Sequence, residues 1–197
     1  SVAIKSSTFS NGISWKDWIA GVGGCETAYV AFDKNNPVLM YAGCYQGIIT
    51  EYNLNLDNSK NIMAYPAMGL GEPSDEQKYR FNWNAPILSS PHDKNTIFHA
   101  GNVLFKSEDG GIKWEVISPD LTRNNKNQQV PGGTPFTNEA AGGENYNPLM
   151  SLSLSPHDSK VIWAGSDDGL IHITRDGAEN WKNVTPKGLK EGIVNSI

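Results

Sequence analysis

The stretch that decides the fold is residues 152–165, which read Leu-Ser-Leu-Ser-Pro-His-Asp-Ser-Lys-Val-Ile-Trp-Ala-Gly. Two earlier segments, 29–43 and 87–101, follow the same plan of an apolar run, a polar turn, a second apolar run and an Ala-Gly step. Each apolar run has the length of a strand, and the residues between the runs favour a hairpin turn. Because the Ala-Gly steps recur about every 60 residues, the unit is too short for a domain and is repeated within one fold.

The composition agrees with short strands joined by tight turns. Gly, Asn, Pro and Asp make up nearly one residue in three, while charged residues reach only 19%. This balance argues against a helical bundle or a coiled coil. The net charge is −5 and the 16 basic residues are scattered, so we expect no nucleic-acid partner. No segment approaches the ~20 apolar residues that cross a bilayer, so no membrane span is predicted.

The second and third units continue with a shared motif. Residues 103–114 read Val-Leu-Phe-Lys-Ser-Glu-Asp-Gly-Gly-Ile-Lys-Trp, and residues 170–181 read Leu-Ile-His-Ile-Thr-Arg-Asp-Gly-Ala-Glu-Asn-Trp. Both resemble the Asp-box, Ser/Thr-x-Asp-x-Gly-x-Thr-Trp, also called the bacterial neuraminidase repeat. The structural residues expected from this resemblance are Ser107, Asp109, Gly111 and Trp114 in one box and Thr174, Asp176 and Trp181 in the other.

Each residue type of the box has a physical role in a tight turn. The Asp carboxylate can accept backbone N–H groups, Gly supplies a positive φ, and Trp can pack between neighbouring sheets. Two departures are expected to matter. Residues 49–57 take the place of a box in the first unit and contain neither Gly nor Trp, and Ala178 predicts a turn of different shape in the third unit.

The boxes, the two Ser-Pro-His-Asp turns and the phrases at 114–123, 165–169 and 181–186 together resemble Asp-box β-propeller proteins of the sortilin-related type. Those proteins are often labelled glycosyl hydrolases, and the resemblance runs from about Trp15 to the end of the chain. It implies an all-β fold, a β-propeller, with about three antiparallel blades of a larger ring. A complete small β-sandwich is the alternative.

The repeat predicts how the chain is organised. Residues 1–22 are expected to end a preceding blade, 24–57, 83–119 and 148–186 to form three blades, and 187–197 to start the next. The predicted strands are 27–32, 38–43, 85–90, 96–100, 103–107, 114–118, 149–154, 160–164, 170–174 and 181–184. Since rings close with about four to eight blades, we interpret the chain as an arc, either a processed chain or an internal piece. Its partners would then include the remaining blades, from the same or another chain.

Two long connections, 58–82 and 120–147, are expected on the face of the ring that carries the Ala-Gly steps. Long loops on a regular scaffold are typically functional or disordered. The ligand-binding candidates on this face are Glu26, Tyr45, Arg80, Trp83, Glu144, Tyr146, Asp167 and Asp168, with Gln46 and Asn102 beside them. Asp167 and Asp168 also suit a hairpin turn, which we favour over catalysis. Glu26 and Glu144 also suit the walls of a wet channel, where polar groups satisfy the backbone.

Two functions remain open. One is a binding or assembly module that recognises a protein or glycan through these loops; the other is a glycoside hydrolase with paired carboxylates. A sialidase-type site binds its substrate carboxylate with three arginines, but the chain has only Arg80, Arg123 and Arg175, and Arg175 belongs to a box on the opposite face. The sequence therefore favours binding and leaves the catalytic residues unknown. His92 and His157 recur in the hairpin turns, so neither a metal site nor a cofactor is predicted.

Cys25 and Cys44 flank the first hairpin. If its strands pair about the turn at 33–37, the two residues lie almost opposite each other, and a disulfide there could replace the missing box. Two free thiols packed as small apolar residues are an equal alternative. The family resemblance implies a secreted or cell-envelope location, and two cysteines neither require nor exclude an oxidising compartment.

Overall fold

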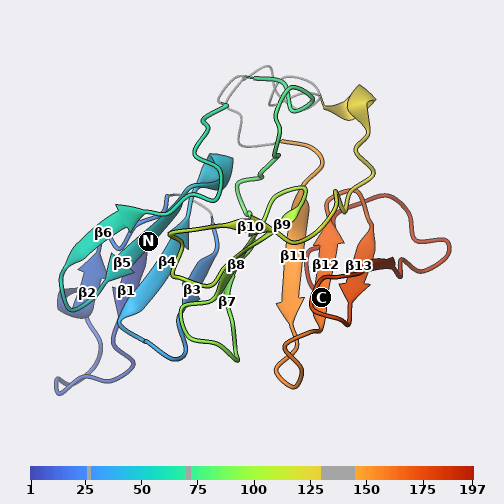
Figure 1. Ribbon diagram of the computed structural model, residues 1–197. Helices are drawn as coiled ribbons and strands as arrows, with labels where there is room; N and C mark the ends of the chain where they lie inside the picture. Colours follow the sequence, from blue (N-terminus) through green and yellow to red (C-terminus); the bar gives the residue numbers. More distant parts are fainter. Residues whose placement is uncertain (26–27, 70–71, 130–144) are drawn as a thin grey trace.

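The computed structural model describes residues 1–25, 28–69, 72–129 and 145–197 (Figure 1). Within these ranges the chain forms four antiparallel sheets and three single-turn 3-10 helices, η1 (Trp15–Asp17), η2 (Tyr45–Gly47) and η3 (Lys126–Gln128). No helix of the described ranges is long and apolar enough to cross a membrane. The prediction of an all-β fold built from antiparallel sheets is confirmed.

The sheets follow one another along the chain, and strands that are neighbours in sequence are neighbours in space. The N-terminal sheet pairs β1 (Val2–Ile4) with β2 (Trp18–Ala20). Sheet 1 contains β3 (Val30–Phe32), β4 (Leu39–Gly43), β5 (Ile49–Asn53) and β6 (Asn58–Asn61). Sheet 2 contains β7 (Ile87–Ser89), β8 (Ile97–Ala100), β9 (Leu104–Ser107) and β10 (Glu115–Val116). Sheet 3 contains β11 (Leu149–Leu154), β12 (Ile162–Ser166), β13 (Ile171–Thr174) and β14 (Lys182–Asn183).

Sheet 1 differs most from the sequence prediction. Residues 49–53 form β5, which no predicted strand covered, and β6 lies inside the segment that we expected to be a connection from residue 58. All four residues of β6, Asn-Ser-Lys-Asn, are polar and exposed. An edge strand without apolar side chains shows no alternation, so sequence patterning does not reveal it.

The hairpin turns between the first two strands of each sheet are held by their own side chains. Asp33 Oδ1 accepts the backbone N–H groups of Asn35 (2.8 Å) and Asn36 (3.1 Å). Ser90 and Ser155 use their hydroxyl oxygens in the same way in the other two turns. Neighbouring turns also touch, since Asp33 Oδ2 accepts from the backbone of Asn95 at 3.2 Å. The hairpin turns therefore line one side of the molecule.

Apolar side chains pack between successive sheets. Met40 and Tyr52 of sheet 1 contact the N-terminal sheet. The other face of sheet 1 packs on Ile87 and Ile97 of sheet 2, whose far face packs on sheet 3. The Tyr29 hydroxyl donates to the Met150 carbonyl at 3.2 Å, so the innermost parts of sheets 1 and 3 approach each other. Figure 1 shows the three sheets side by side, with the described parts of the long connections extending on one side.

The hydrogen-bond register shows which positions of the three sheets are equivalent. The second and third strands pair through Met40 and Tyr52, Ile97 and Ser107, and Ile162 and Thr174. At the end of the second strand or just after it, Cys44, Gly101 and Ser166 each donate a backbone N–H to the residue that precedes the third strand. The Gly101 carbonyl accepts from Leu149 N at 2.9 Å, and the Ser166 carbonyl accepts from Val194 N at 3.0 Å. Val194 therefore bonds to sheet 3 in the same way as Leu149, the first residue of β11, bonds to sheet 2.

Candidate functional site

Four of the eight predicted ligand-binding residues gather where sheets 2 and 3 meet, on the side of the long connections. Arg80 ends the first connection, Tyr146 precedes β11, and Asp167 and Asp168 follow β12. Tyr45 and Trp83 form a separate pair, with ring centroids 5.3 Å apart in an edge-on arrangement. Glu26 and Glu144 lie outside the described residues. The junction between sheets 2 and 3 is therefore the candidate site.

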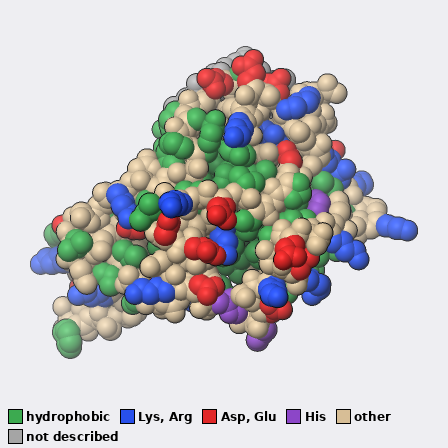
Figure 2. All heavy atoms as spheres, in the orientation of Figure 1, with side chains coloured by type: hydrophobic (Ala, Val, Ile, Leu, Met, Phe, Trp, Pro, Cys, Tyr) green, Lys and Arg blue, Asp and Glu red, His purple; other side chains and the backbone are tan. Residues whose placement is uncertain are grey.

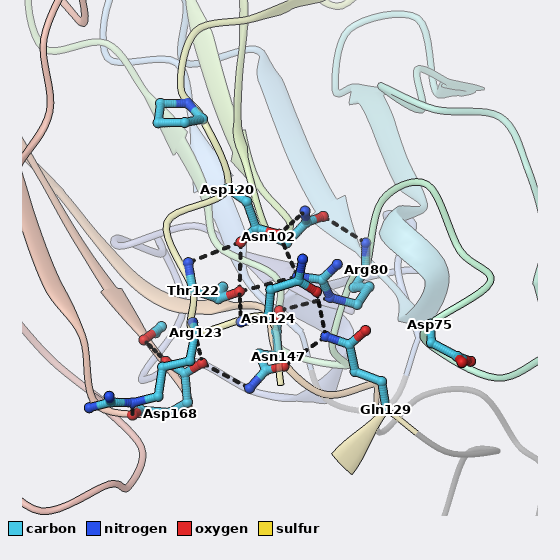
Figure 3. A network of polar contacts seen from close by, with 12 residues as sticks. Asp75, Arg80, Asn102, Asp120, Thr122, Arg123, Asn124, Gln129, Asn147 and Asp168 are labelled. Atoms are coloured by element: carbon cyan, nitrogen blue, oxygen red, sulfur yellow. Dashed lines mark hydrogen bonds and ion pairs between the residues drawn. The ribbon is translucent and has the colours of Figure 1, made fainter. Parts of the chain in front are cut away.

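Arg80 is the centre of a polar network in this junction (Figure 3). Its side chain is 3% exposed, and Nη2 donates to Asp120 Oδ2 at 2.7 Å and to Thr122 Oγ1 at 3.1 Å. Its Nε donates to the Asn147 carbonyl at 3.2 Å. Asn102 joins the same group, accepting from Arg80 N at 2.9 Å and donating to Asp120 Oδ2 at 2.9 Å. The Arg80 side chain therefore links the first connection to the second, residues 120–147, of which it bonds Asp120, Thr122 and Asn147.

Asp120 is the negative partner in the network. Burial would raise the pKa of this carboxyl, but hydrogen bonds from Thr122 and Arg80, together with the Arg80 charge, hold it below its usual value. The ionised form is therefore the stable one near neutral pH, and it matches the buried guanidinium.

Asp168 is fully buried, and both oxygens of its carboxylate accept hydrogen bonds. Oδ2 accepts from Arg123 N at 2.7 Å and from Asn147 Nδ2 at 2.8 Å, while Oδ1 accepts from the Ser166 hydroxyl. The Asn147 side chain in turn accepts from Gln129 Nε2 at 2.9 Å. Because the Asp168 side chain is fully buried and both of its oxygens accept hydrogen bonds from the protein, Asp168 is a structural anchor.

Asp167 has the opposite environment to its chain neighbour. It is 7% exposed, yet Oδ1 is buried and has no hydrogen-bond partner within the described residues. Burial raises the pKa of Asp167 to about 8, the adjacent Asp168 charge adds to this rise, and the Arg80 charge opposes it. Buried polar atoms are rarely left without a partner, and an exception calls for a functional or structural explanation.

Tyr146 and Glu191 complete the surroundings of Asp167. The Tyr146 hydroxyl donates to Glu191 Oε1 at 2.9 Å. Burial, that hydrogen bond and the charges of Asp167, Glu191 and Asp168 all raise the pKa of Tyr146 above its usual value. Glu191 also acts on Asp167 and raises its pKa. The charges that act on the Asp167 carboxyl are therefore mainly acidic, with Arg80 as the opposing charge.

Sequence reasoning missed most of the network. Asp120, Thr122 and Arg123 lie in the segment Ser118-Pro-Asp-Leu-Thr-Arg123, which we used only for its family resemblance. Asn147, Gln129 and Glu191 carried no signal at all. The contacts join residues that are about 20 to 70 positions apart in the chain, and a single sequence gives no spacing rule for such pairs.

The first connection also forms a cavity of ≈ 180 Å³, whose lining includes Gln46, Tyr65, Glu72, Gln77, Tyr79 and Phe81. The Lys78 ammonium lies over two of these rings, 5.8 Å from the centroid of Tyr65 and 5.0 Å from that of Tyr79. Asn145, next to Tyr146, donates to Gln77 Oε1 at 3.1 Å and so ties this cavity to the junction. Among these residues the sequence had drawn attention only to Gln46.

The two segments that resemble Asp-boxes form closed turns. Asp109 Oδ1 accepts from Ile112 N (3.0 Å) and Lys113 N (2.9 Å), and Asp176 Oδ1 accepts from Asn180 N (2.9 Å). Each hydroxyl of Ser107 and Thr174 binds its box carboxylate and also accepts a backbone N–H, from Gly111 and Ala178 respectively. Trp114 and Trp181 donate their indole N–H to the preceding sheet, to the carbonyls of Ile62 and Ile117. These residues staple adjacent sheets together.

Ala178 corrects one sequence expectation. We expected its turn to differ in shape, but Ala178 has φ 78° where Gly111 has φ 85°, and both donate to the hydroxyl that opens the box. The two turns therefore have the same shape, and in the second one a residue with a Cβ adopts the strained left-handed conformation.

We expect Ala178→Gly to raise the free energy of unfolding by about 0.5–1 kcal/mol, because it removes this strain. Gly111→Ala is the matched comparison. A Cβ there would lie 2.6 Å from Ile62 Cδ1, so this variant should be destabilised by clash as well as by strain. Urea denaturation of the two variants measures both effects, and a destabilised Ala178→Gly would contradict the strain argument.

Cys25 and Cys44 form a disulfide, with their Cα atoms 5.0 Å apart. The register of the first hairpin pairs Val30 with Ala42 and Ala31 with Tyr41, a shift of about two positions from the pairing that we assumed. The bond forms nevertheless, because before β3 begins the Cys25 backbone N–H donates to the Gly43 carbonyl at 3.1 Å, which places Cys25 beside Cys44. The bond closes a loop across a sequence separation of 19.

We expect the double variant Cys25→Ala/Cys44→Ala to lose roughly 3 kcal/mol of unfolding free energy, since the closed loop limits the unfolded chain. The measurement is chemical denaturation with and without a reducing agent. Reduction should lower the stability of the original chain to that of the variant and leave the variant unchanged. Equal stability of the oxidised chain and the variant would show that the bond contributes nothing.

The side chains on the face drawn in Figure 2 include lysine and arginine scattered among acidic residues. Within the described residues, no group of three or more His, Cys, Asp or Glu side chains is arranged to hold a metal ion.

No family model and no curated protein matches the chain. Among solved structures, a GH74 xyloglucanase from Xanthomonas campestris is similar over 82% of this chain and 23% of its own, with 14% identity and a TM-score of 0.51. An ancestral GH74 enzyme is similar over 80% of this chain and 18% of its own, with 14% identity and a TM-score of 0.48. The chain therefore spans about a fifth of the length of these structures. The likeness to the xyloglucanase shows that the sheets share the β-propeller fold of a GH74 enzyme.

Proposed function

We propose that the chain is a ligand-binding part of a β-propeller, and that its ligand, a glycan or a protein, binds at the junction around Asp167. The observation that carries this proposal is the buried and unpartnered Oδ1 of Asp167. Arg80 bonds to Asp120, and Asp168 bonds to Arg123 and Asn147, but no hydrogen bond of this network within the described residues reaches Asp167 Oδ1. A rigid frame around one unused polar group is the arrangement expected of a binding site.

The remaining blades of the ring are the second partner that we propose. Tyr41 and Phe98 occupy equivalent register positions and are buried by the following sheet, but Trp163 at the same position of sheet 3 is only half-buried. At the other end, Val2, Ile4 and Trp18 share an exposed face of the N-terminal sheet. Apolar faces of this kind suit contact with further sheets, from the same or another polypeptide. The disulfide agrees with a secreted or cell-envelope location, which we propose with it.

A glycoside hydrolase is the second candidate. It is favoured by Asp167, because a carboxyl that stays protonated near neutral pH can serve as a general acid. Asp168 does not suit the role of its partner, since it is fully buried and both of its oxygens accept hydrogen bonds from the protein. Glu191 is then the second carboxylate within the described part of the site. One available acid and one exposed carboxylate support binding better than they support hydrolysis.

The test uses an array of soluble glycans and peptides, probed with the chain and with two variants that each remove one acid. Asp167→Asn changes the site, and Glu179→Gln changes an exposed residue of the second box. We expect at least one ligand to bind the chain and Glu179→Gln equally and to bind Asp167→Asn at least tenfold more weakly. Ligands that bind all three alike would contradict the proposal. Release of reducing sugar from a bound glycan, lost in Asp167→Asn, would favour the hydrolase instead.

A further inference from the structure

The cavity of the first connection is lined by two aromatic rings that form a corner. The rings of Tyr65 and Tyr79 meet edge-on, with their centroids 5.0 Å apart and their planes at 83°. Tyr79 also packs edge-on against Phe105 of β9, at a centroid distance of 4.9 Å. Both tyrosines pack against the apolar cluster that contains Phe105. Because this cluster includes a strand of sheet 2, the aromatic corner is held in place before any ligand arrives.

A cation of the chain itself lies in the aromatic corner. The Lys78 ammonium is 5.0 Å from the centroid of Tyr79 and 5.8 Å from that of Tyr65, within the roughly 6 Å over which a ring attracts a cation. Lys78 is exposed, and within the described ranges no ion pair joins it to an acid. The rings are therefore its partners, and its long flexible stem lets the ammonium leave them.

Acidic side chains line the same cavity. Glu72 and Glu76 are both exposed, and in the described part of the chain neither forms an ion pair. Among the described residues of the lining, Lys78 is the one base, so the acids outnumber it. Aromatic faces and carboxylates both attract cations, and the resident lysine compensates only part of this negative charge.

The size and shape of the cavity restrict the group that can enter the corner. Its volume of ≈ 180 Å³ is smaller than the about 300–1,000 Å³ of pockets that enclose a whole drug-sized ligand, so it suits a head group. A flat sugar ring needs one open aromatic face, whereas two rings at right angles suit a compact, rounded group. A phosphate beside the cation would be repelled by Glu72 and Glu76.

We propose that this cavity binds a methylated ammonium group, that of choline or of a trimethylated lysine side chain, which replaces the Lys78 ammonium between Tyr65 and Tyr79. Methyl groups remove the N–H donors of an ammonium, so the methylated cation has less hydration to lose than Lys78 when it contacts the rings. Asp167 is not among the described residues that line the cavity. The inference therefore goes beyond the function proposed above, and either can fail without the other.

The experiment is an NMR titration of the chain with three probes. They are choline, a short peptide that contains trimethyllysine, and dimethylbutanol, in which carbon replaces the charged nitrogen of choline. We expect choline or the peptide to bind at least about tenfold more tightly than dimethylbutanol, because only these two carry a charge. The tighter of the two identifies the source of the group. Equal binding of dimethylbutanol, or no binding of any probe, would overturn the inference.

Lys78→Ala tests whether the resident lysine occupies the site. Its removal should strengthen choline binding by about threefold or more, a gain that an unfolded variant cannot produce. Lys187→Ala removes the same charge from an exposed lysine that does not line the cavity, and it should leave binding unchanged. Equal strengthening in both variants would overturn the inference, because net charge alone would explain it. Unchanged or weaker binding in Lys78→Ala would overturn it as well.

Tyr65→Phe and Tyr65→Leu separate the ring from its hydroxyl group. Phenylalanine keeps the aromatic face and should keep choline binding within about twofold, whereas leucine should weaken it about tenfold. Urea denaturation of both variants checks that each is folded. Binding lost in the folded Phe variant would assign the contact to the hydroxyl, and binding kept in both would show that the ring does not contact the cation. Either result would overturn the inference.

Discussion

Asp167→Asn is expected to raise the free energy of unfolding by up to about 5 kcal/mol at pH 8 and to change it little at pH 4. The asparagine keeps the shape of the side chain and removes its charge. In the folded chain burial raises the pKa of Asp167 to about 8, whereas the unfolded carboxyl titrates near its ordinary value of 3.8. Between these pH values the folded state holds a proton that the unfolded state has lost.

The sign follows from this difference in proton binding. The stability contributed by the neutral carboxyl is fully present below pH 4 and is lost as the pH rises to about 8, with a slope of about 1.4 kcal/mol per unit at most. Asparagine has no proton to lose, so its advantage grows over the same range. Urea denaturation at pH 4, 6 and 8 measures it. An advantage that is the same at all three values would show that Asp167 is not a buried neutral acid.

Arg80→Met is expected to lose about 3–5 kcal/mol of unfolding free energy, because it leaves Asp120 ionised, partly buried and without its charge partner. Methionine fills a similar length of apolar space, so the loss reports the polar contacts more than the packing. Asn147 and Thr122 also lose a donor. Arg175→Met, at an exposed arginine of the second Asp-box, should cost less than about 0.5 kcal/mol.

A double-mutant cycle with Asp120→Asn separates the ion pair from the rest of the network. If Arg80 and Asp120 stabilise the junction mainly through each other, the double variant should lose less unfolding free energy than the two single variants lose in sum. The expected difference is about 1–3 kcal/mol. Strict additivity of the two losses would mean that the pair at 2.7 Å is not energetically coupled. Arg80 would then contribute through its packing and its hydrogen bonds to Asn147 and Thr122.

The repeated local patterns made the fold predictable. Strand, turn, strand and Ala-Gly recur three times, and each turn is closed by a side chain that belongs to it, such as Asp33, Ser90 or Ser155. Local hydrogen bonds of this kind leave a signature in residue type and spacing. By contrast β6 is polar and exposed, and it is defined only by its pairing with β5, so its sequence gives no periodic signal.

The candidate site could be predicted only in part. Arg80, Tyr146, Asp167 and Asp168 were identified because they are charged or aromatic residues on the predicted loop face, but their roles depend on contacts across two connections. Asp167 and Asp168 are adjacent in sequence and opposite in environment, since Asp167 Oδ1 has no partner among the described residues and Asp168 accepts three hydrogen bonds. Only the three-dimensional positions of Asn147, Arg123 and Ser166 distinguish them.

The protonation state of Asp167 tests the account most directly. Carbon-detected NMR of side-chain carboxyl groups, recorded from pH 3 to 10 and assigned by comparison with Asp167→Asn, follows each acid separately. We predict that the Asp167 carboxyl titrates with a pKa near 8, while those of Asp120 and Asp109 titrate below their usual value. A pKa near 4 for Asp167 would show a solvated or internally paired carboxylate, and would contradict the buried, unpartnered acid on which the proposed site rests.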